Sequence, residues 1–188
     1  MSKGDLRRQY LSKRLALNNE DLTAFNAAIQ RRLFALLQQH DFQCVHIFLP
    51  LVAKREVDTW PAIRWLWKNG KTVVVPRLSE DRSEIRTVLL EVSTTLTEGI
   101  WGLSEPLHPV QADPNRIDIV VLPLLIFDEK GYRLGYGKGY YDVFIRSIRR
   151  PVLKIGLSFF DPVEEIPGRD EWDVPLDMAV TPRALFRF

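Results

Sequence analysis

The residues best suited to bind an anion lie in the stretch Gly131–Asp142, which reads GYRLGYGKGYYD. Closely spaced glycines let the backbone turn tightly and present its N–H groups to a phosphate or carboxylate. A helix is predicted to begin at about Gly139, and the partial positive charge of a helix N-terminus adds attraction for an anion. Arg133 and Lys138 bring positive charge to the same loop. Asp142 offers an oxygen ligand for the Mg²⁺ that accompanies a nucleotide.

This segment matches neither of two well-known phosphate-binding motifs. Lys138 is followed by Gly139 rather than by Ser or Thr, which excludes a P-loop, and the glycine spacing differs from that of the dinucleotide fingerprint. A purely structural interpretation also stays open, in which residues 128–131 turn a β-hairpin and the glycines serve only the backbone. The sequence favours an anion site without excluding the hairpin.

A second group of cations lies on the predicted helix at residues 3–17. At about 100° per residue, Lys3, Arg7 and Arg14 form a row that runs down the apolar face, flanked by leucines. Solvated charges normally lie opposite the apolar face, so cations in this position need an anionic partner or must extend to water. The partner is either a carboxylate of the protein or a phosphate or carboxylate of a ligand.

Other candidate residues lie in predicted loops. Glu56 follows a strand, where a carboxylate can pair with two N–H donors of a heterocycle, although a solvated loop glutamate is the alternative. Trp101 lies between glycines in Gly-Ile-Trp-Gly and is either a stacking surface or a cover for the core. Asp173 is a further carboxylate, and the sequence does not tell whether it lies near Asp142. The three histidines have no metal-ligand spacing, and no Ser-His-Asp pattern is visible.

The elements that must position these residues alternate between helices and strands. The sequence predicts helices at residues 3–17, 20–39, 59–68 and 139–149, and strands at 44–49, 71–75, 85–92, 117–122, 152–157 and 177–181. Asn19 is the predicted N-cap of the second helix, Pro76 the predicted end of a strand, and residues 94–116 are predicted to be rich in loops. The strand–helix–strand order at 44–75 favours a parallel sheet. The predicted fold is an α/β single-domain sandwich, Rossmann-like, with a mostly parallel central sheet flanked by helices and function at the carboxyl ends of its strands.

The composition limits the class of protein. The chain has 188 residues, and 26 Lys and Arg against 24 Asp and Glu give a formal net charge of +2. This balance argues against a general nucleic-acid or membrane-surface protein. A lone cysteine, Cys44, excludes an internal disulfide and a cysteine-based zinc site. With no linker, repeat, signal or long apolar segment, we expect one domain over residues 1–188, in the cytoplasm, without nucleic-acid or membrane partners.

Taken together, these motifs resemble the 5-formyltetrahydrofolate cyclo-ligase family, also called methenyltetrahydrofolate synthetases. The long run from Phe127 to Asp142 carries most of the resemblance. Shorter matches follow the same order over nearly the whole chain: Lys3-x-x-x-Arg7, Glu56-Val-Asp-Thr, Gly-Ile-Trp101-Gly-Leu-Ser-Glu-Pro, and Glu-Trp-Asp173-Val-Pro-Leu-Asp with Thr181-Pro182. One departure is the passage Leu49–Arg55, which looks longer than is usual in the family.

The resemblance implies an ATP- and Mg²⁺-dependent ligase that converts 5-formyltetrahydrofolate to 5,10-methenyltetrahydrofolate. ADP and phosphate are released, and the reaction passes through a phosphorylated N-formyl intermediate. The implied catalytic residues are Arg133 and Lys138. The implied ATP-binding residues are Lys3, Arg7, Arg133, Leu134, Gly135, Tyr136, Gly137, Lys138, Gly139, Tyr140 and Tyr141. The implied folate-binding residues are Leu49, Glu56, Trp101, Tyr140 and Tyr141, and the implied Mg²⁺ ligands are Asp142 and Asp173.

The implied enzyme is a monomer that takes folate with or without a polyglutamate tail. Two other classes stay open: a different α/β enzyme acting on phosphorylated small molecules, and a non-catalytic regulator that binds folate or nucleotide. RNA binding is the weakest alternative at a net charge of +2.

Overall fold

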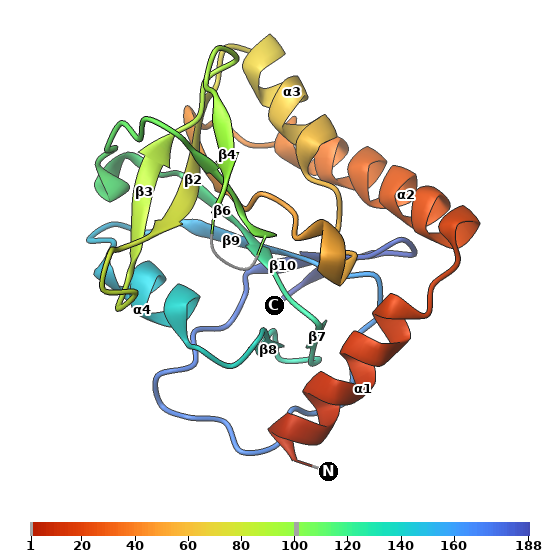
Figure 1. Ribbon diagram of the computed structural model, residues 1–188. Coiled ribbons are helices and arrows are strands. Elements are labelled where there is room, and N and C mark those ends of the chain that lie inside the picture. The colour runs from red at the N-terminus through yellow and green to blue at the C-terminus, as the bar shows by residue number, and fades with distance from the viewer. Residues whose placement is uncertain (1, 100–101) are drawn as a thin grey trace.

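The structure, a computed structural model, describes residues 2–99 and 102–188 (Figure 1). The helices are α1 (Lys3–Leu15), α2 (Asn19–Leu37), α3 (Trp60–Lys68) and α4 (Tyr140–Ser147), with short 3₁₀ turns at Val52–Lys54 and Pro114–Arg116. The strands are β1 (Cys44–Ile47), β2 (Thr72–Leu78), β3 (Ile85–Leu89), β4 (Leu96–Glu98), β5 (Ser104–Pro106), β6 (Ile119–Pro123), β7 (Ile126–Phe127), β8 (Arg133–Leu134), β9 (Leu153–Leu157), β10 (Met178–Val180) and β11 (Leu185–Arg187). No helix of the described residues is long and apolar enough to cross a membrane.

The central sheet has seven strands in the order β11-β10-β9-β6-β1-β2-β3. The five inner strands pair in parallel, and only β3 and β11 at the two edges run antiparallel to their neighbours. The chain proceeds from β1 to β2 on one side and later returns with β6 on the other side of β1. This reversal makes the gap beyond the ends of β1 and β6 a topological switch point, where α/β sheets commonly bind ligands.

Helices cover both faces of this sheet (Figure 1). Alternate strand residues such as Val45, Ile47 and Val73 are buried under α2 and α3, whereas Val74 and Val120 are buried under α4. Strands of a parallel sheet are apolar on both faces for this reason, and their sequences read as continuous apolar runs. The predicted mostly parallel α/β sandwich is confirmed.

The first helix, α1, packs away from the central sheet and against the small β7–β8 hairpin (Figure 1). Leu6 of α1 is buried with Ile126, Leu134 and Ile166. The hairpin turn is held by the fully buried Asp128, whose Oδ1 accepts hydrogen bonds from the backbone N–H of Lys130 and Tyr132, each at 3.0 Å. The hairpin interpretation of this turn is therefore correct, and the glycine-rich segment continues directly from it.

Two local predictions need correction, and one region gains detail. The strand at 71–75 does not end at Pro76 but continues to Leu78, because residues 74–78 pair with β3. On its other side, β1 pairs only with residues 72–74. Beyond them that side of β2 is open, so the missing N–H of proline costs no ladder bond. The N-cap of α2 is Asn18 rather than Asn19. The region 94–116, predicted to be loop-rich, contains the β4–β5 hairpin, whose strands are too short to stand out in the sequence.

Candidate active site

A cavity of about 540 Å³ opens beyond the carboxyl ends of the central strands. Residues just after β1, at the ends of β2 and β6, and in the segment joining β8 to α4 form its wall. The N-terminal half of α1 and the segment around Asp173 close another side. Its volume is that of a small-molecule site, and its position is the one expected at a switch point.

Nearly all the residues implied by the resemblance line this one cavity. They are Lys3, Arg7, Leu49, Glu56, Arg133, Leu134, Gly135, Tyr136, Gly137, Lys138, Gly139, Tyr140, Tyr141, Asp142 and Asp173. Trp101 lies outside the described residues. Segments separated by more than 100 residues in the sequence thus meet around the same space.

The glycine-rich segment passes close to α1 because of Gly137. This residue has a φ of +88°, which L side chains rarely adopt, and a Cβ atom placed there would lie 3.1 Å from Cζ of Arg7. The Arg7 guanidinium packs over this bend and donates from Nε to the Gly135 carbonyl at 3.3 Å. Gly139 then caps α4 with a left-handed conformation. The free N–H groups of the first turn of α4 and a guanidinium therefore border the same part of the cavity.

Lys3 forms ion pairs at the mouth of the cavity. Its ammonium donates to Asp173 Oδ2 at 2.8 Å and to Asp170 Oδ2 at 3.0 Å. Burial works to lower the pKa of Lys3, but the hydrogen bonds and charges of Asp173 and Asp170 outweigh it and raise that pKa above its usual value. Burial works to raise the pKa of Asp173, and the Asp170 N–H and Lys3 outweigh it in the opposite direction. Within the row of cations on α1, Lys3 thus has carboxylate partners in the protein.

Arg133 is the buried cation of the site, with its side chain 6% exposed. Its Nη2 donates to Asp142 Oδ1 at 2.9 Å, and its Nη1 donates to the carbonyl of Val174. Asp142 Oδ1 also accepts from the Val174 N–H at 3.0 Å. Arg133 and Asp142 thus fasten the start of α4 to the segment that carries Asp173. Asp142 uses Oδ1 in these contacts, and Asp173 uses Oδ2.

Glu56 lies on the wall of the same cavity and is 8% exposed. The passage Leu49–Arg55 contains a 3₁₀ turn and folds back, so that the Leu51 N–H donates to Glu56 Oε2 at 2.8 Å. The Tyr136 hydroxyl donates to Oε1 at 2.6 Å. Burial raises the pKa of Glu56, while these hydrogen bonds and the charge of Arg14 act against it. The passage Leu49–Arg55 therefore helps to hold the carboxylate in place.

Two tyrosines at the start of α4 differ in their surroundings. The Tyr140 hydroxyl donates to the Arg82 carbonyl at 2.9 Å and so links α4 to the β2–β3 turn. The Tyr141 hydroxyl is fully buried and has no hydrogen-bond partner among the described residues, and burial raises its pKa. Below it lies the ring of His46, with the two ring centroids 6.0 Å apart.

Several lining residues were not predicted from the sequence. Lys54 and Leu51 reach the cavity from the passage before Glu56, Asp170 lies beside Asp173, and residues 103–105 reach it from the β4–β5 hairpin. A lysine in the passage after β1 was a usable signal for Lys54. Asp170 and the hairpin residues carry no sequence pattern that would place them here.

These features define a class of protein: an α/β protein whose ligand cavity has a cationic, glycine-rich end and a carboxylate end. The sequence model of the 5-formyltetrahydrofolate cyclo-ligase family matches residues 1–182. The chain therefore belongs to the 5-formyltetrahydrofolate cyclo-ligase family and is an enzyme of the ligase class.

Individual relatives agree with this assignment. The 5-formyltetrahydrofolate cyclo-ligase of Mycoplasma pneumoniae is 30% identical over 182 residues, covering 96% of this chain and 98% of its own. The enzyme of the same name from Escherichia coli K12 is 31% identical over 138 residues, covering 71% of this chain and 75% of its own. Among solved structures, the 5,10-methenyltetrahydrofolate synthetase of Aquifex aeolicus superposes with a TM-score of 0.85 at 31% identity, covering 100% of this chain and 93% of that one.

Proposed function

We propose that the protein converts 5-formyltetrahydrofolate to 5,10-methenyltetrahydrofolate and consumes ATP and Mg²⁺ in doing so. The observation that carries the proposal is the placement of a cationic glycine-rich segment and a buried carboxylate on the wall of one cavity. The first suits the phosphates of a nucleotide, and the second suits the N–H donors of a pterin ring. Family membership supports the same assignment.

The chemistry needs activation because the oxygen of an N-formyl group is a poor leaving group. In the proposed reaction this oxygen attacks the γ-phosphorus of ATP, which breaks the bond to ADP and gives a phosphorylated N-formyl group. N10 of the folate then attacks the activated carbon, loses its proton and expels phosphate as the ring closes. The enzyme's contribution is to position the two substrates and to stabilise the charge that develops on the transferred phosphoryl group.

At the cationic end, Lys3, Arg7, Arg133 and Lys138 supply positive charge, and the backbone from Leu134 to Tyr141 wraps the nucleotide. Arg133 and Lys138 have the catalytic role of stabilising the transferred phosphoryl group. Arg133 is held rigid by Asp142 and Val174, whereas Lys138 is exposed and free to approach the phosphates. This pairing of one fixed and one mobile cation supports the assignment.

At the other end, Glu56 binds the pterin ring. One hydrogen bond to each of its oxygens comes from the protein, and a carboxylate has further lone pairs for N–H donors of the ligand. Leu49, Tyr140 and Tyr141 form the walls around the folate, and Trp101 completes them. The unpartnered Tyr141 hydroxyl supports this role, because a buried hydroxyl gains from a ligand acceptor.

Asp142 and Asp173 are the proposed Mg²⁺ ligands. Mg²⁺ prefers oxygen donors and is commonly held by one or two carboxylates together with substrate phosphates. Both side chains line the cavity, and each has a second oxygen beyond the one already hydrogen-bonded. Bound there, Mg²⁺ supplies positive charge that offsets the charge of the ATP phosphates.

We further propose that the chain acts as a single-domain monomer in the cytoplasm and that it accepts folate with a polyglutamate tail. Lys54 at the cavity wall supports the last point, since its ammonium can pair with a γ-linked carboxylate.

The test mixes the protein with Mg²⁺, ATP and 5-formyltetrahydrofolate and follows the absorbance of methenyltetrahydrofolate together with ADP. We expect both signals to rise together and to need every component. Lys138→Ala should lower turnover at least tenfold, whereas Lys130→Ala, in the nearby hairpin turn outside the cavity wall, should match the wild type. Folate and nucleotide binding without ADP would support a non-catalytic regulator. ATP consumption independent of folate would support a different phosphoryl-transfer enzyme.

A further inference from the structure

Arg14, on the buried face of α1, is not part of the site assigned above. Its residue exposure is only 3%, and its guanidinium donates to the Leu124 carbonyl at 3.3 Å and to the Tyr136 hydroxyl at 2.5 Å. Burying a cation is costly unless it gains partners, and its Nε has none among the described residues. The fold therefore buries a positive charge behind the cavity although its desolvation is unfavourable.

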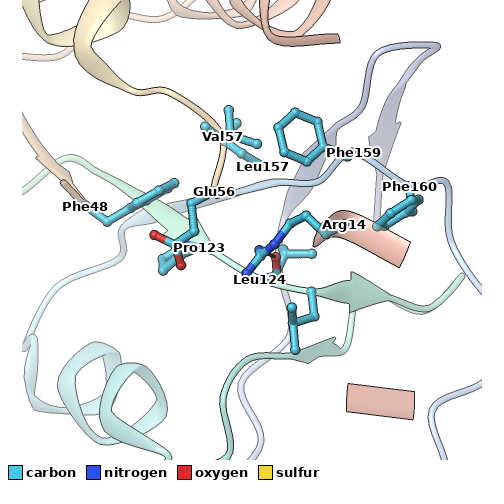
Figure 2. A pocket seen from close by; sticks show the side chains of 10 residues that line it. Arg14, Phe48, Glu56, Val57, Pro123, Leu124, Leu157, Phe159 and Phe160 are labelled. Atoms are coloured by element: carbon cyan, nitrogen blue, oxygen red, sulfur yellow. Dashed lines mark hydrogen bonds between the residues drawn. The ribbon is translucent and has the colours of Figure 1, made fainter. Parts of the chain in front are cut away.

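Figure 2 shows where this charge lies: Arg14 and Glu56 are on the wall of the same small cavity of about 10 Å³. The remaining lining is apolar and comprises Phe48, Val57, Pro123, Leu124, Leu125, Leu157, Phe159 and Phe160. Electrostatic interactions are stronger in such surroundings than in water. The Arg14 charge thus acts on Glu56 across apolar surroundings, which screen the interaction poorly.

A hydrogen-bonded relay connects the two residues directly. Arg14 donates to the Tyr136 hydroxyl, and this hydroxyl donates to Glu56 Oε1 at 2.6 Å. A guanidinium has no acceptor, so it can only engage a lone pair of the hydroxyl, and the single hydroxyl proton is left to point at Glu56. Arg14 therefore fixes the direction of the relay.

We propose that Arg14 is a positioning residue that keeps the Glu56 carboxylate ionised and oriented toward the folate. The proposal rests on the proposed function, in which ionised Glu56 binds the pterin N–H donors. Besides Arg14, the groups that face Glu56 are Tyr136 from the segment after β8, Tyr141 from α4 and the Leu51 N–H. Lys54 also lines the large cavity. The tyrosines are neutral near pH 7, so on the buried side Arg14 supplies the positive charge.

The experiment compares Arg14→Met with the wild type over pH 5–9. Loss of the charge raises the pKa of Glu56, so the acid limb of kcat/KM for folate should move to higher pH by about one unit or more. At pH 8, kcat should change little, and KM for ATP should stay the same. Arg14→Lys, which keeps the charge, should return the acid limb most of the way to its wild-type position. Lys13→Met, on the exposed face of the same helix, should leave the profile unchanged.

A second readout does not depend on turnover. The Glu56 carboxyl carbon, labelled with ¹³C and followed by NMR, should titrate at higher pH in Arg14→Met than in wild type, and Tyr136→Phe should shift it in the same direction. An unshifted titration with a uniformly lower kcat would overturn the proposal and leave Arg14 a structural role only. If the titration shifts but no folate activity is found, the relay stands and the proposed function fails. Should Arg14→Met not fold, Tyr136→Phe carries the same comparison, because it removes the hydroxyl of the relay, and Arg14→Lys serves as the variant that keeps the charge.

Discussion

The two ends of the large cavity hold their charges in different ways. At the cationic end, Lys3 pairs with Asp170 and Asp173, and the Asp170 side chain is 68% exposed. Exposed ion pairs contribute only about 0–1 kcal/mol. Lys3 can therefore exchange its contact with the exposed Asp170 for a phosphate. At the other end, Glu56 is fixed by a backbone N–H and by the hydrogen-bonded relay from Arg14 through Tyr136. One end is prepared to rearrange, and the other is organised in advance.

The largest expected effect comes from Arg133, the one buried member of the cationic end. Arg133→Lys keeps the charge but loses the planar fork that bridges Asp142 and Val174. We expect turnover to fall by about 10²–10³-fold, with a lower thermal midpoint. Steady-state kinetics and calorimetry measure both.

Arg183→Lys, an exposed residue paired with Asp161, is the matched control and should change neither quantity. Wild-type turnover in Arg133→Lys would mean that the cationic end does not depend on a fixed guanidinium. All the cations of that end would then be free to rearrange, in contrast to the fixed Glu56.

The bend at Gly137 should give an intermediate effect. Gly137→Ala imposes a positive φ on an L residue, at about 1–2 kcal/mol, and pushes the Arg7 guanidinium away from Gly135. We expect KM for ATP to rise about tenfold, with KM for folate nearly unchanged, as measured by varying each substrate in turn.

Gly168→Ala provides the control, because its φ is +63° and a Cβ there meets nothing within 4 Å. Gly168→Ala therefore has the same unfavourable positive φ as Gly137→Ala but no close contact with another side chain. Equal rises in KM for both substrates of Gly137→Ala would show that the two ends are coupled through this segment.

His46, beneath Tyr141, has the smallest effect on activity, because it concerns stability alone. Burial lowers the pKa of His46 to about 3 from the usual 6.5. Between about pH 6.5 and pH 3, His46 is therefore protonated in the unfolded chain and neutral in the folded protein. The free energy of unfolding falls as the pH drops through this range, by up to about 1.4 kcal/mol per pH unit. Denaturant unfolding at pH 5 and pH 7.5 measures the difference.

His46→Leu should remove this part of the pH dependence, whereas His108→Gln, at an exposed position, should keep it. An unchanged dependence in His46→Leu would show that His46 does not contribute to acid sensitivity.

Much of the fold could be predicted because it depends on local patterns. Apolar runs such as 117–122 mark buried parallel strands, and capping residues mark helix starts within a residue or two. The small strands escaped detection because two or three residues carry too little pattern. The role of Pro76 depended on how far β1 extends, which no local signal reveals.

The candidate site could be predicted as a set of residues but not as a set of contacts. The glycine-rich segment and the row on α1 were visible, yet the pairing of Lys3 with Asp173 joins residues 170 positions apart. Arg14 stood out as a cation on an apolar face. Its link to Glu56 through Tyr136 depends on tertiary contacts, and these cannot be read from the residues next to Arg14 in the sequence.

The docking of α1 has a consequence for the order in which the protein matures. Its partners lie far along the chain: Lys3 pairs with Asp173, 170 positions further on, and Arg7 with Gly135, 128 positions further on. During synthesis these partners leave the ribosome well after α1 does. Leu6 therefore stays uncovered until they arrive, and α1 docks only after the glycine-rich segment and the segment around Asp173 have been made.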